Sequence, residues 1–354
     1  MPQSGDGLVV FVYEFMAACG AHGLELDLTL RDSLLREGTA MLLALVEDFA
    51  AVPTVQLVTM CDHCLRMPDL PHVECHSIGS AHEEQQTFQR LAAKADWTLV
   101  VAPEMDGVLL ERSRLVQSLG GRLLGAGIDA VQVGSDKNLT AERWLSNGVP
   151  HPSGVPVEPG RTRPQNVGFP AILKPADGAG SSGVCRVQNA HQWNEMTLPN
   201  KRMRLESYSE GLPASVAVLH SPAGQVTLPA FSQHFLDKDE FTYLGGELLM
   251  DAEWQRRARD LALHAASVVQ STTGYIGVDI VLGKDPGGAD DVAIELNPRI
   301  TTSYIGLRHA VDHNLAEMLL ELAMNQTSRP TYDVKQSVEF WSDGKVSTKP
   351  TCEL

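Results

Sequence analysis

The chain of 354 residues is long enough for two or three packed layers around a sizeable core, at about 150 residues per domain. Its net charge of −16, with no compensating basic stripe, argues against nucleic acid as a partner. No later stretch approaches the ~20 apolar residues that span a bilayer, and the first apolar run, Leu8–Phe15, is interrupted by Glu14 and follows no positive segment. We therefore expect a cytoplasmic protein without a membrane partner.

Short apolar runs alternate with helical patterns over the first 134 residues. Strands are predicted at Leu8–Tyr13, Val55–Thr59 and Trp97–Ala102, and helices at residues 33–49, 83–95 and 113–119. Strands that alternate with helices imply a parallel sheet covered on both faces. The first predicted domain is therefore an α/β unit over residues 1–134.

From Asp136 onward the pattern changes to one helix followed by consecutive strands. That helix stops at Gly148, and the polar residues 150–168 are expected to form a connector. The next predicted elements are strands Phe169–Leu173, Gly183–Val187, Met203–Tyr208 and Ser215–His220, helix Trp254–Gln270, a hairpin of Tyr275–Leu282 and Val292–Leu296, and a helix over residues 315–325. We expect an α+β domain over residues 135–330. A polar tail, residues 331–354, would pack on the body or on a neighbouring subunit, so a homodimer stays open.

Acidic and amide side chains recur on the predicted hairpin. Glu295, Asn297 and Arg299 are spaced by two, so on a strand they project from one face, and Asp279 lies in the partner strand. Two carboxylates and a carboxamide provide the hard oxygen ligands that suit Mg²⁺, which uses few protein ligands together with phosphates. The arginine could stabilise a transferring phosphoryl group. The same residues would also suit the exposed face of an ordinary hairpin.

A second candidate site is a buried strand that ends at Lys174 and the Gly- and Ser-rich loop after it. The loop contains Gly178, Gly180, Ser181, Ser182 and Gly183. Glycines let backbone amides approach a phosphate closely, and serine hydroxyls add donors. Because a strand follows, the pattern differs from the helix-opening phosphate loop. A hairpin loop without a ligand is the alternative, but it leaves the lysine at the strand end unexplained.

Five segments, in this order, resemble the ATP-grasp superfamily. They are Asp136–Thr140, Gly148–Pro152, Lys174-Pro175 with the Gly/Ser loop, Leu205–Tyr208 with Gly211 and Ser215-Val216, and Asp279 with Glu295–Arg299. The resemblance implies an ATP-grasp fold, in which two subdomains clamp ATP, preceded by a parallel-sheet pre-ATP-grasp domain. Where many members carry a carboxylate for the ribose hydroxyls, this chain has Pro213, and Glu210 is the substitute that the sequence offers.

The same resemblance implies roles for individual residues. They are Lys137, Lys174, Ser181, Ser182, Gly183, Glu206, Ser207, Tyr208 and Glu210 for ATP, Asp279, Glu295 and Asn297 for one or two Mg²⁺ or Mn²⁺ ions, and Arg299 with Lys174 for catalysis. Within this scheme the lysines neutralise the phosphates, the Gly/Ser loop closes over them, and Ser207 and Tyr208 hold adenine. Arg299 would stabilise an acyl phosphate and then a tetrahedral intermediate.

Shorter matches in the first domain resemble the tyramine–glutamate ligase group. They are Tyr13–Phe15, Glu37–Leu42 with Val46–Phe49, and Ala102–Glu104. The resemblance implies an ADP-forming ligase that joins glutamate to an amine such as tyramine in the biosynthesis of a one-carbon carrier cofactor. Another ATP-grasp ligase of peptides or amino acids, and a non-catalytic ATP-binding regulatory protein, are the alternatives. An oxidoreductase is poorly supported, because no Gly-x-Gly-x-x-Gly follows the first strand.

Three further features stay open. Glu14 and Glu104 come at the ends of predicted strands, where α/β sheets usually bind ligands, so substrate contact and plain surface location both fit. His234 and Tyr243 fall in a segment that we expect to be irregular, and they could line an acceptor pocket. Cys61–Cys64 has thiols at a zinc spacing, with His72, Cys75 and His76 downstream. Because a second paired motif is lacking, we favour an ordinary loop there.

Overall fold

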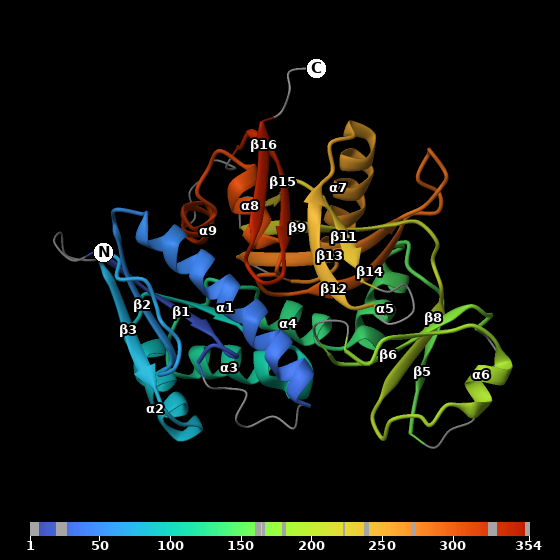
Figure 1. Cartoon of the computed structure of the whole chain (residues 1–354), viewed down its shortest axis with the longest axis horizontal. Helices are drawn as coiled ribbons and strands as arrows, with labels where there is room; N and C mark the ends of the chain where they lie inside the picture. Colours follow the sequence, from blue (N-terminus) through green and yellow to red (C-terminus); the bar gives the residue numbers. More distant parts are fainter. Residues whose placement is uncertain are drawn as a thin grey trace.

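Three β-sheets and the helices that connect them build the molecule (Figure 1). The structure is a computed structural model that describes residues 7–18, 27–159, 164, 167–178, 182–221, 224–236, 241–270, 273–324 and 331–350. Within these ranges, no helix combines the length and the apolar character that a membrane crossing requires.

The N-terminal part is a parallel sheet with the strand order β3-β2-β1-β4. Its elements are β1 (Leu8–Glu14), α1 (Leu28–Ala50), β2 (Val55–Asp62), β3 (Val73–Ile78), α2 (Ala81–Ala92), β4 (Trp97–Val101), the short 3₁₀ helix η2 (Met105–Gly107), α3 (Val108–Ser118) and α4 (Ile128–Gly134). Every residue of β4 is buried, as expected for a parallel strand covered on both faces. The predicted parallel sheet is confirmed.

The prediction of an ordinary loop around Cys61, Cys64 and Cys75 is wrong for Cys75 and the histidine that follows it. Cys75 and His76 lie on β3, an edge strand, and Cys75 Sγ is 3.4 Å from Cys61 Sγ on β2. In the part of the chain that the structure describes, the metal-binding side chains that gather in a group of three are Asp62, His63 and Cys64. Strand pairing therefore accounts for the short distance between the thiols, and no set of four zinc ligands assembles around them there.

A small antiparallel sheet, with the order β5-β8-β6-β7, follows helix α5 (Lys137–Ser146). Its elements are β5 (Gly154–Val157), β6 (Ala171–Pro175), β7 (Cys185–Val187), α6 (Ala190–Glu195) and β8 (Met203–Ser207). Leu173, Trp193 and Leu205 form part of its own small core. Residues 154–157 had been expected within a connector; instead they form an edge strand of this sheet.

The third sheet is the largest and runs in the order β14-β13-β9-β11-β12-β15-β16, with β10 beside β9. Its elements are β9 (Leu212–Ser221), β10 (Gly224–Thr227), β11 (Phe231–Phe235), β12 (Tyr243–Leu248), α7 (Ala252–Ser267), β13 (Gly274–Leu282), β14 (Val292–Asn297), α8 (Tyr304–Ala310), α9 (Leu315–Ala323), β15 (Gln336–Trp341) and β16 (Val346–Pro350). The segment expected to be a polar tail thus supplies two strands, and β15 pairs with β12. His234 and Tyr243 lie on strands β11 and β12, so the prediction of an irregular segment is wrong.

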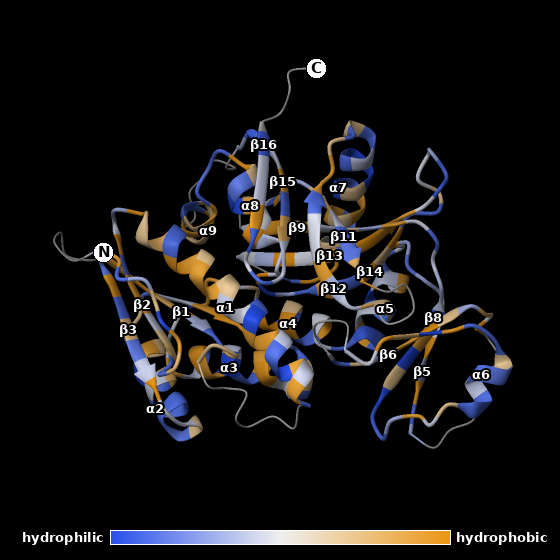
Figure 2. Cartoon of the chain, viewed as in Figure 1, coloured by the Kyte–Doolittle hydropathy of each residue, from blue (hydrophilic) through white to orange (hydrophobic). Residues whose placement is uncertain are grey.

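The N-terminal sheet and the large sheet share their cores. One cluster of buried residues includes Val12 of β1, Leu45 of α1, Leu219 of β9 and Tyr275 of β13. Hydrophobic residues are frequent along α1 and α4, which lie between the two sheets (Figure 2). This shared packing fixes the ends of the N-terminal strands relative to the β13–β14 hairpin.

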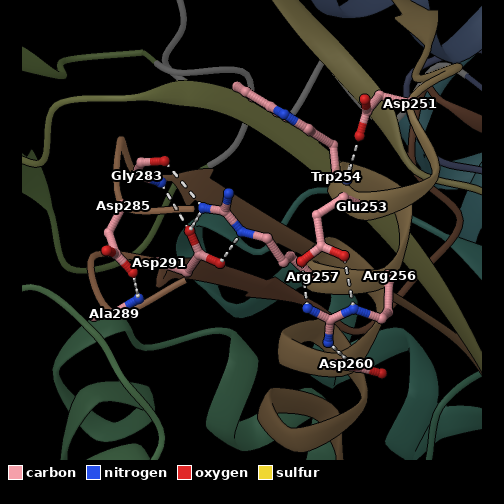
Figure 3. A network of polar contacts seen from close by, with 10 residues as sticks. All are labelled: Asp251, Glu253, Trp254, Arg256, Arg257, Asp260, Gly283, Asp285, Ala289 and Asp291. Atoms are coloured by element: carbon pink, nitrogen blue, oxygen red, sulfur yellow. Dashed lines mark hydrogen bonds and ion pairs between the residues drawn. The ribbon is translucent and has the colours of Figure 1, made fainter. Parts of the chain in front are cut away.

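A buried ion pair connects α7 with the turn between β13 and β14 (Figure 3). Arg257 Nη2 and Nε lie 2.5 and 2.9 Å from the two carboxylate oxygens of Asp291, and the two side chains are 5% and 8% exposed. Asp291 also accepts a hydrogen bond from the backbone N–H of Gly283 at 2.8 Å. On the same helix, Arg256 pairs instead with exposed acids, among them Asp260 at 2.9 Å.

Asp291→Asn should lower the free energy of unfolding by about 2 kcal/mol, because it leaves the Arg257 guanidinium buried without its counter-charge. Asp260→Asn makes the same chemical change opposite an arginine on the same helix, but at the surface, and should leave stability unchanged within error. Urea denaturation of both variants measures the difference. Equal stability of the two variants would contradict the role given to the buried pair.

Candidate functional site

Side chains from all three sheets line one cavity between them. The predicted site residues that line it are Lys174, Glu206, Ser207, Tyr208, Asp279, Glu295, Asn297 and Arg299. Lys137 reaches the same place through an ion pair with Glu295. Ser182 and Gly183 precede Val184, which is at the cavity wall, and Ser181 lies outside the described residues. Gly183 has φ +72°, a left-handed conformation that favours glycine.

Antiparallel pairing of β13 and β14 brings the acidic and amide side chains together. Asp279 stands opposite Glu295, and the register shifts between Asp279 and Ile280. Asn297 Nδ2 and Gln233 Nε2 donate hydrogen bonds to the two oxygens of Asp279, at 3.0 and 2.9 Å. Burial, followed by the charge of Glu295, raises the pKa of Asp279 to about 6. A divalent cation would relieve this repulsion, so the donor set fits a hard metal ion.

Helix α5 directs Lys137 at the second carboxylate. The helix begins at Lys137, because the side chain of Asp136 accepts hydrogen bonds from the N–H groups of Asn138 and Leu139. Lys137 Nζ lies 2.8 Å from Glu295 Oε1. Burial alone would raise the pKa of Glu295, but the positive charges of Lys137 and Lys174 hold it below its ordinary value. Glu295 is therefore ionised under all conditions near neutral pH.

The strand-end lysine of β6 meets a glutamate of the neighbouring strand β8. Lys174 Nζ lies 2.5 Å from Glu206 Oε1 and donates a hydrogen bond to the carbonyl oxygen of Ile294 at 3.2 Å. Arg204 Nε lies 2.7 Å from the other oxygen of Glu206. Lys174 is thereby held between the small sheet and β14, next to Glu295, with its ammonium group at the cavity wall.

The far end of the cavity is formed by the residues after β8. Tyr208 is stacked under the guanidinium of Arg186, at 3.9 Å from ring centroid to Cζ, and lines the cavity together with Ser207 and Pro213. Glu210 lines an adjoining hollow, where it forms an exposed ion pair with Lys284 at 2.9 Å. The ribose role of Glu210 stays a prediction.

Arg299 joins the hairpin to the N-terminal sheet. Its Nε and Nη2 atoms lie 2.8 and 3.0 Å from the two carboxylate oxygens of Glu104. Glu104 and Glu14 are each 2% exposed, which rules out a plain surface location for both. The bidentate contact orients the guanidinium, and it explains why an acidic residue follows β4.

Four cavity residues were not assigned a role from the sequence. Glu37 of α1 accepts a hydrogen bond from Thr302 Oγ1, across most of the length of the chain. Gln233 bonds to Asp279, while Thr302 and Ser303 line the same wall. Glu37 lies in the segment Glu37–Leu42, and the resemblance of this segment to the tyramine–glutamate ligase group was the only signal in the sequence that could have identified it. Gln233 has no local signal, because only the pairing of distant strands brings it to Asp279.

Comparison with known proteins gives two family matches along the chain. Residues 55–131 match the family model of the pre ATP-grasp 3 domain, and residues 134–303 match that of the ATP-grasp domain. The chain is 24% identical to the tyramine–L-glutamate ligase of Methanocaldococcus jannaschii over 297 residues, which are 83% of this chain and 85% of that protein. It is 26% identical over 250 residues to the carbamoyl phosphate synthase large chain of Synechocystis sp., covering 64% of this chain and 23% of that one.

Solved structures with the same fold include members with different chemistry. An ATP-grasp superfamily protein from Archaeoglobus fulgidus aligns with a TM-score of 0.67 at 22% identity, covering 94% of this chain and 92% of the other. The L-amino acid ligase from Bacillus licheniformis aligns with a TM-score of 0.66 at 13% identity, covering 96% and 80%. The predicted fold is confirmed: a pre-ATP-grasp domain precedes an ATP-grasp domain, and the chain belongs to the ATP-grasp superfamily.

Proposed function

We propose that the protein is an ATP-dependent, ADP-forming ligase that joins a carboxylate to an amine. The observation that carries the proposal is the pairing of β13 with β14, which places Asp279, Glu295 and Asn297 side by side. Lys137 and Lys174 approach Glu295 from two other elements. Acidic oxygens beside two ammonium groups suit a complex of ATP with one or two Mg²⁺ or Mn²⁺ ions.

Different residues around the β13–β14 hairpin would hold the metal ions, the phosphates and the adenine of this complex. Asp279, Glu295 and Asn297 would hold the ions, whose charge neutralises the phosphates when they are bound. Lys137 is paired with Glu295 and Lys174 with Glu206. Both lysines would donate hydrogen bonds to phosphate oxygens. The loop ending at Gly183 would cover them, and Ser207 and Tyr208 would contact adenine.

In the proposed reaction an oxygen of the carboxylate attacks the γ-phosphorus, and the bond to ADP breaks. The nitrogen of the uncharged amine then attacks the carbonyl carbon of the acyl phosphate. The bond from that carbon to the phosphate oxygen breaks, and the inorganic phosphate that leaves takes up the proton lost by the nitrogen as the amide forms. Arg299, oriented by Glu104, would stabilise the negative charge that develops in both steps. Side chains of all three sheets line the cavity, which would limit the access of water to the acyl phosphate.

The similarity to a tyramine–L-glutamate ligase over 83% of the chain supports glutamate and an amine such as tyramine as substrates. A place in the biosynthesis of a one-carbon carrier cofactor is part of this proposal and rests on the sequence resemblance. A screen of ADP release with glutamate and a panel of amines, tyramine among them, tests this. ADP release that depends on both partners would support the ligase. ATP binding without any such release would instead favour a regulatory ATP-binding protein.

Asp279→Asn and Glu295→Gln should each reduce ADP formation at least about 100-fold, because each removes a charged ligand from the proposed metal site. Asp290→Asn is the matched control, since Asp290 lies in the turn of the same hairpin but is exposed. A coupled assay of ADP measures the rates, and circular dichroism checks the fold. Full turnover in either carboxylate variant would show that the metal assignment is wrong.

Metal binding should weaken as the pH falls through about 6, because burial and Glu295 raise the pKa of Asp279 to about 6 and only its deprotonated form binds a cation. A titration of Mn²⁺ alone, followed by electron paramagnetic resonance, should show a dissociation constant that rises about tenfold per pH unit below pH ~6. Above about pH 7 it should be constant. Asp279→Asn should bind Mn²⁺ weakly without this dependence, and an unchanged pH profile in the variant would refute the assignment.

A further inference from the structure

The cavity extends past Arg299 into the N-terminal part and ends on two carboxylates, Glu14 and Glu37, which we call the acidic pair. Glu14 is the last residue of β1, and its Oε2 accepts a hydrogen bond from the N–H of Ala17 at 2.6 Å. Its carboxylate lies directly on Gly38 of α1, where an added Cβ would come within 2.5 Å of Oε1. The glycine therefore allows the carboxylate to lie beside Glu37 at the cavity wall.

The acidic pair differs from the other carboxylates of the cavity in its lack of a counter-charge. Glu206 pairs with Lys174 and Arg204, Glu295 pairs with Lys137, and Asp279 belongs to the proposed metal site. Among the residues that the structure describes, Glu14 and Glu37 form no ion pair. Arg299 acts on both only at a distance, because its guanidinium is bound to Glu104.

A buried carboxylate, Glu14, next to a half-buried one, Glu37, is costly without a cation, and this cost raises their pKa values. Burial raises the pKa of Glu14 to about 7, and it also raises the pKa of Glu37. Tyr243 lines the same cavity, and burial, together with the charges of Glu37 and Asp279, raises the pKa of its hydroxyl. An organic cation that enters the cavity would remove this cost.

The walls next to the acidic pair are apolar. Met16 after β1, together with Leu34 and Met41 of α1, line this end of the cavity, and all three are buried. Tyr208, the proposed adenine contact, directly follows β8 of the small sheet, which lies on the other side of the molecule from the N-terminal sheet (Figure 1). A group held by the acidic pair would thus lie beyond Arg299 and the metal ligands as seen from the nucleotide, where the second substrate must approach the acyl phosphate.

We propose that Glu14 and Glu37 bind the ammonium group of the amine substrate, and that Met16, Leu34 and Met41 bind its apolar chain. This inference rests on the proposed function and names the chemical class of the acceptor: a primary amine on an aryl or alkyl chain. Short, strongly polar amines should be poor acceptors, because they carry no apolar group that could pack against Leu34 and Met41 of α1.

Calorimetric titration tests the subsite without catalysis. The full-length protein, saturated with Mg²⁺ and a non-hydrolysable ATP analogue, is titrated with tyramine, n-hexylamine, methylamine and n-hexanol. Tyramine or hexylamine should bind, and Glu14→Gln and Glu37→Gln should each weaken that binding about tenfold or more while nucleotide affinity stays unchanged. Glu47→Gln, on the same helix but paired with Arg308, is the matched control and should bind as the wild type does.

Two results would overturn the subsite: hexanol binding as tightly as hexylamine, or amine affinity unchanged in both acidic-pair variants. Absence of binding by tyramine and hexylamine in the wild-type protein would overturn it as well. Leu34→Ala should weaken binding of hexylamine but not of methylamine, whereas equal effects would contradict the apolar wall.

Trapping with hydroxylamine separates this inference from the proposed function. Hydroxylamine is small and uncharged near neutral pH, so it should capture an acyl phosphate of glutamate without the acidic pair. The acidic-pair variants should keep hydroxamate formation while losing amide formation with tyramine. Loss of both products would show that Glu14 and Glu37 are needed to bind or activate the carboxylate substrate, and this would overturn the inference. A wild-type protein that binds amines but forms no hydroxamate would refute the ligase function alone.

Discussion

Antiparallel pairing of β13 with β14 places two half-buried carboxylates, Asp279 and Glu295, opposite each other, and the site is arranged around that pair. Two negative charges on neighbouring strands repel one another, so the surrounding elements must supply cations. Lys137 comes from the first residue of α5, Lys174 from the end of β6, and Arg299 from the residue after the strand-ending proline. The three cations arrive from different parts of the fold, so the hairpin organises the space between the sheets.

Two of these three cations are also paired with an acid outside the proposed metal site. Glu206 holds Lys174 with the help of Arg204, and Glu104 orients Arg299 through two contacts. These pairs fix long, flexible side chains before a nucleotide arrives, which reduces the entropy lost on binding. The acidic pair of Glu14 and Glu37 stands apart from this scheme, because an external cation is needed to balance it.

Much of the fold, and the close approach of the side chains proposed to hold the metal, could be predicted from local patterns. The polar turn between two apolar runs predicts the β13–β14 hairpin, and the spacing of Glu295, Asn297 and Arg299 by two predicts their common face. The pairing of Lys174 with Glu206 could not be predicted, because it depends on the register between two strands of the small sheet. Long-range contacts such as Glu37 with Thr302 have no local pattern at all.

The missed elements share a physical cause. Strand β3 is an edge strand with mostly exposed side chains, so it lacks the continuous apolar run of its neighbours. Strands β15 and β16 lie at the edge of the large sheet, and only Val338 and Phe340 of β15 are buried, a weak alternation within a polar segment. A polar sequence at a sheet edge therefore resembles a loop or a tail until its partner strand is known.

The most direct test of the proposed magnesium–ATP site is a crystal structure with Mg²⁺ and a non-hydrolysable ATP analogue. The account predicts metal ions held by Asp279, Glu295 and Asn297 against the terminal phosphates, with the Lys137 ammonium moved from Glu295 to a phosphate oxygen. Nucleotide bound away from the β13–β14 hairpin, or metal ions that contact none of these three side chains, would contradict it.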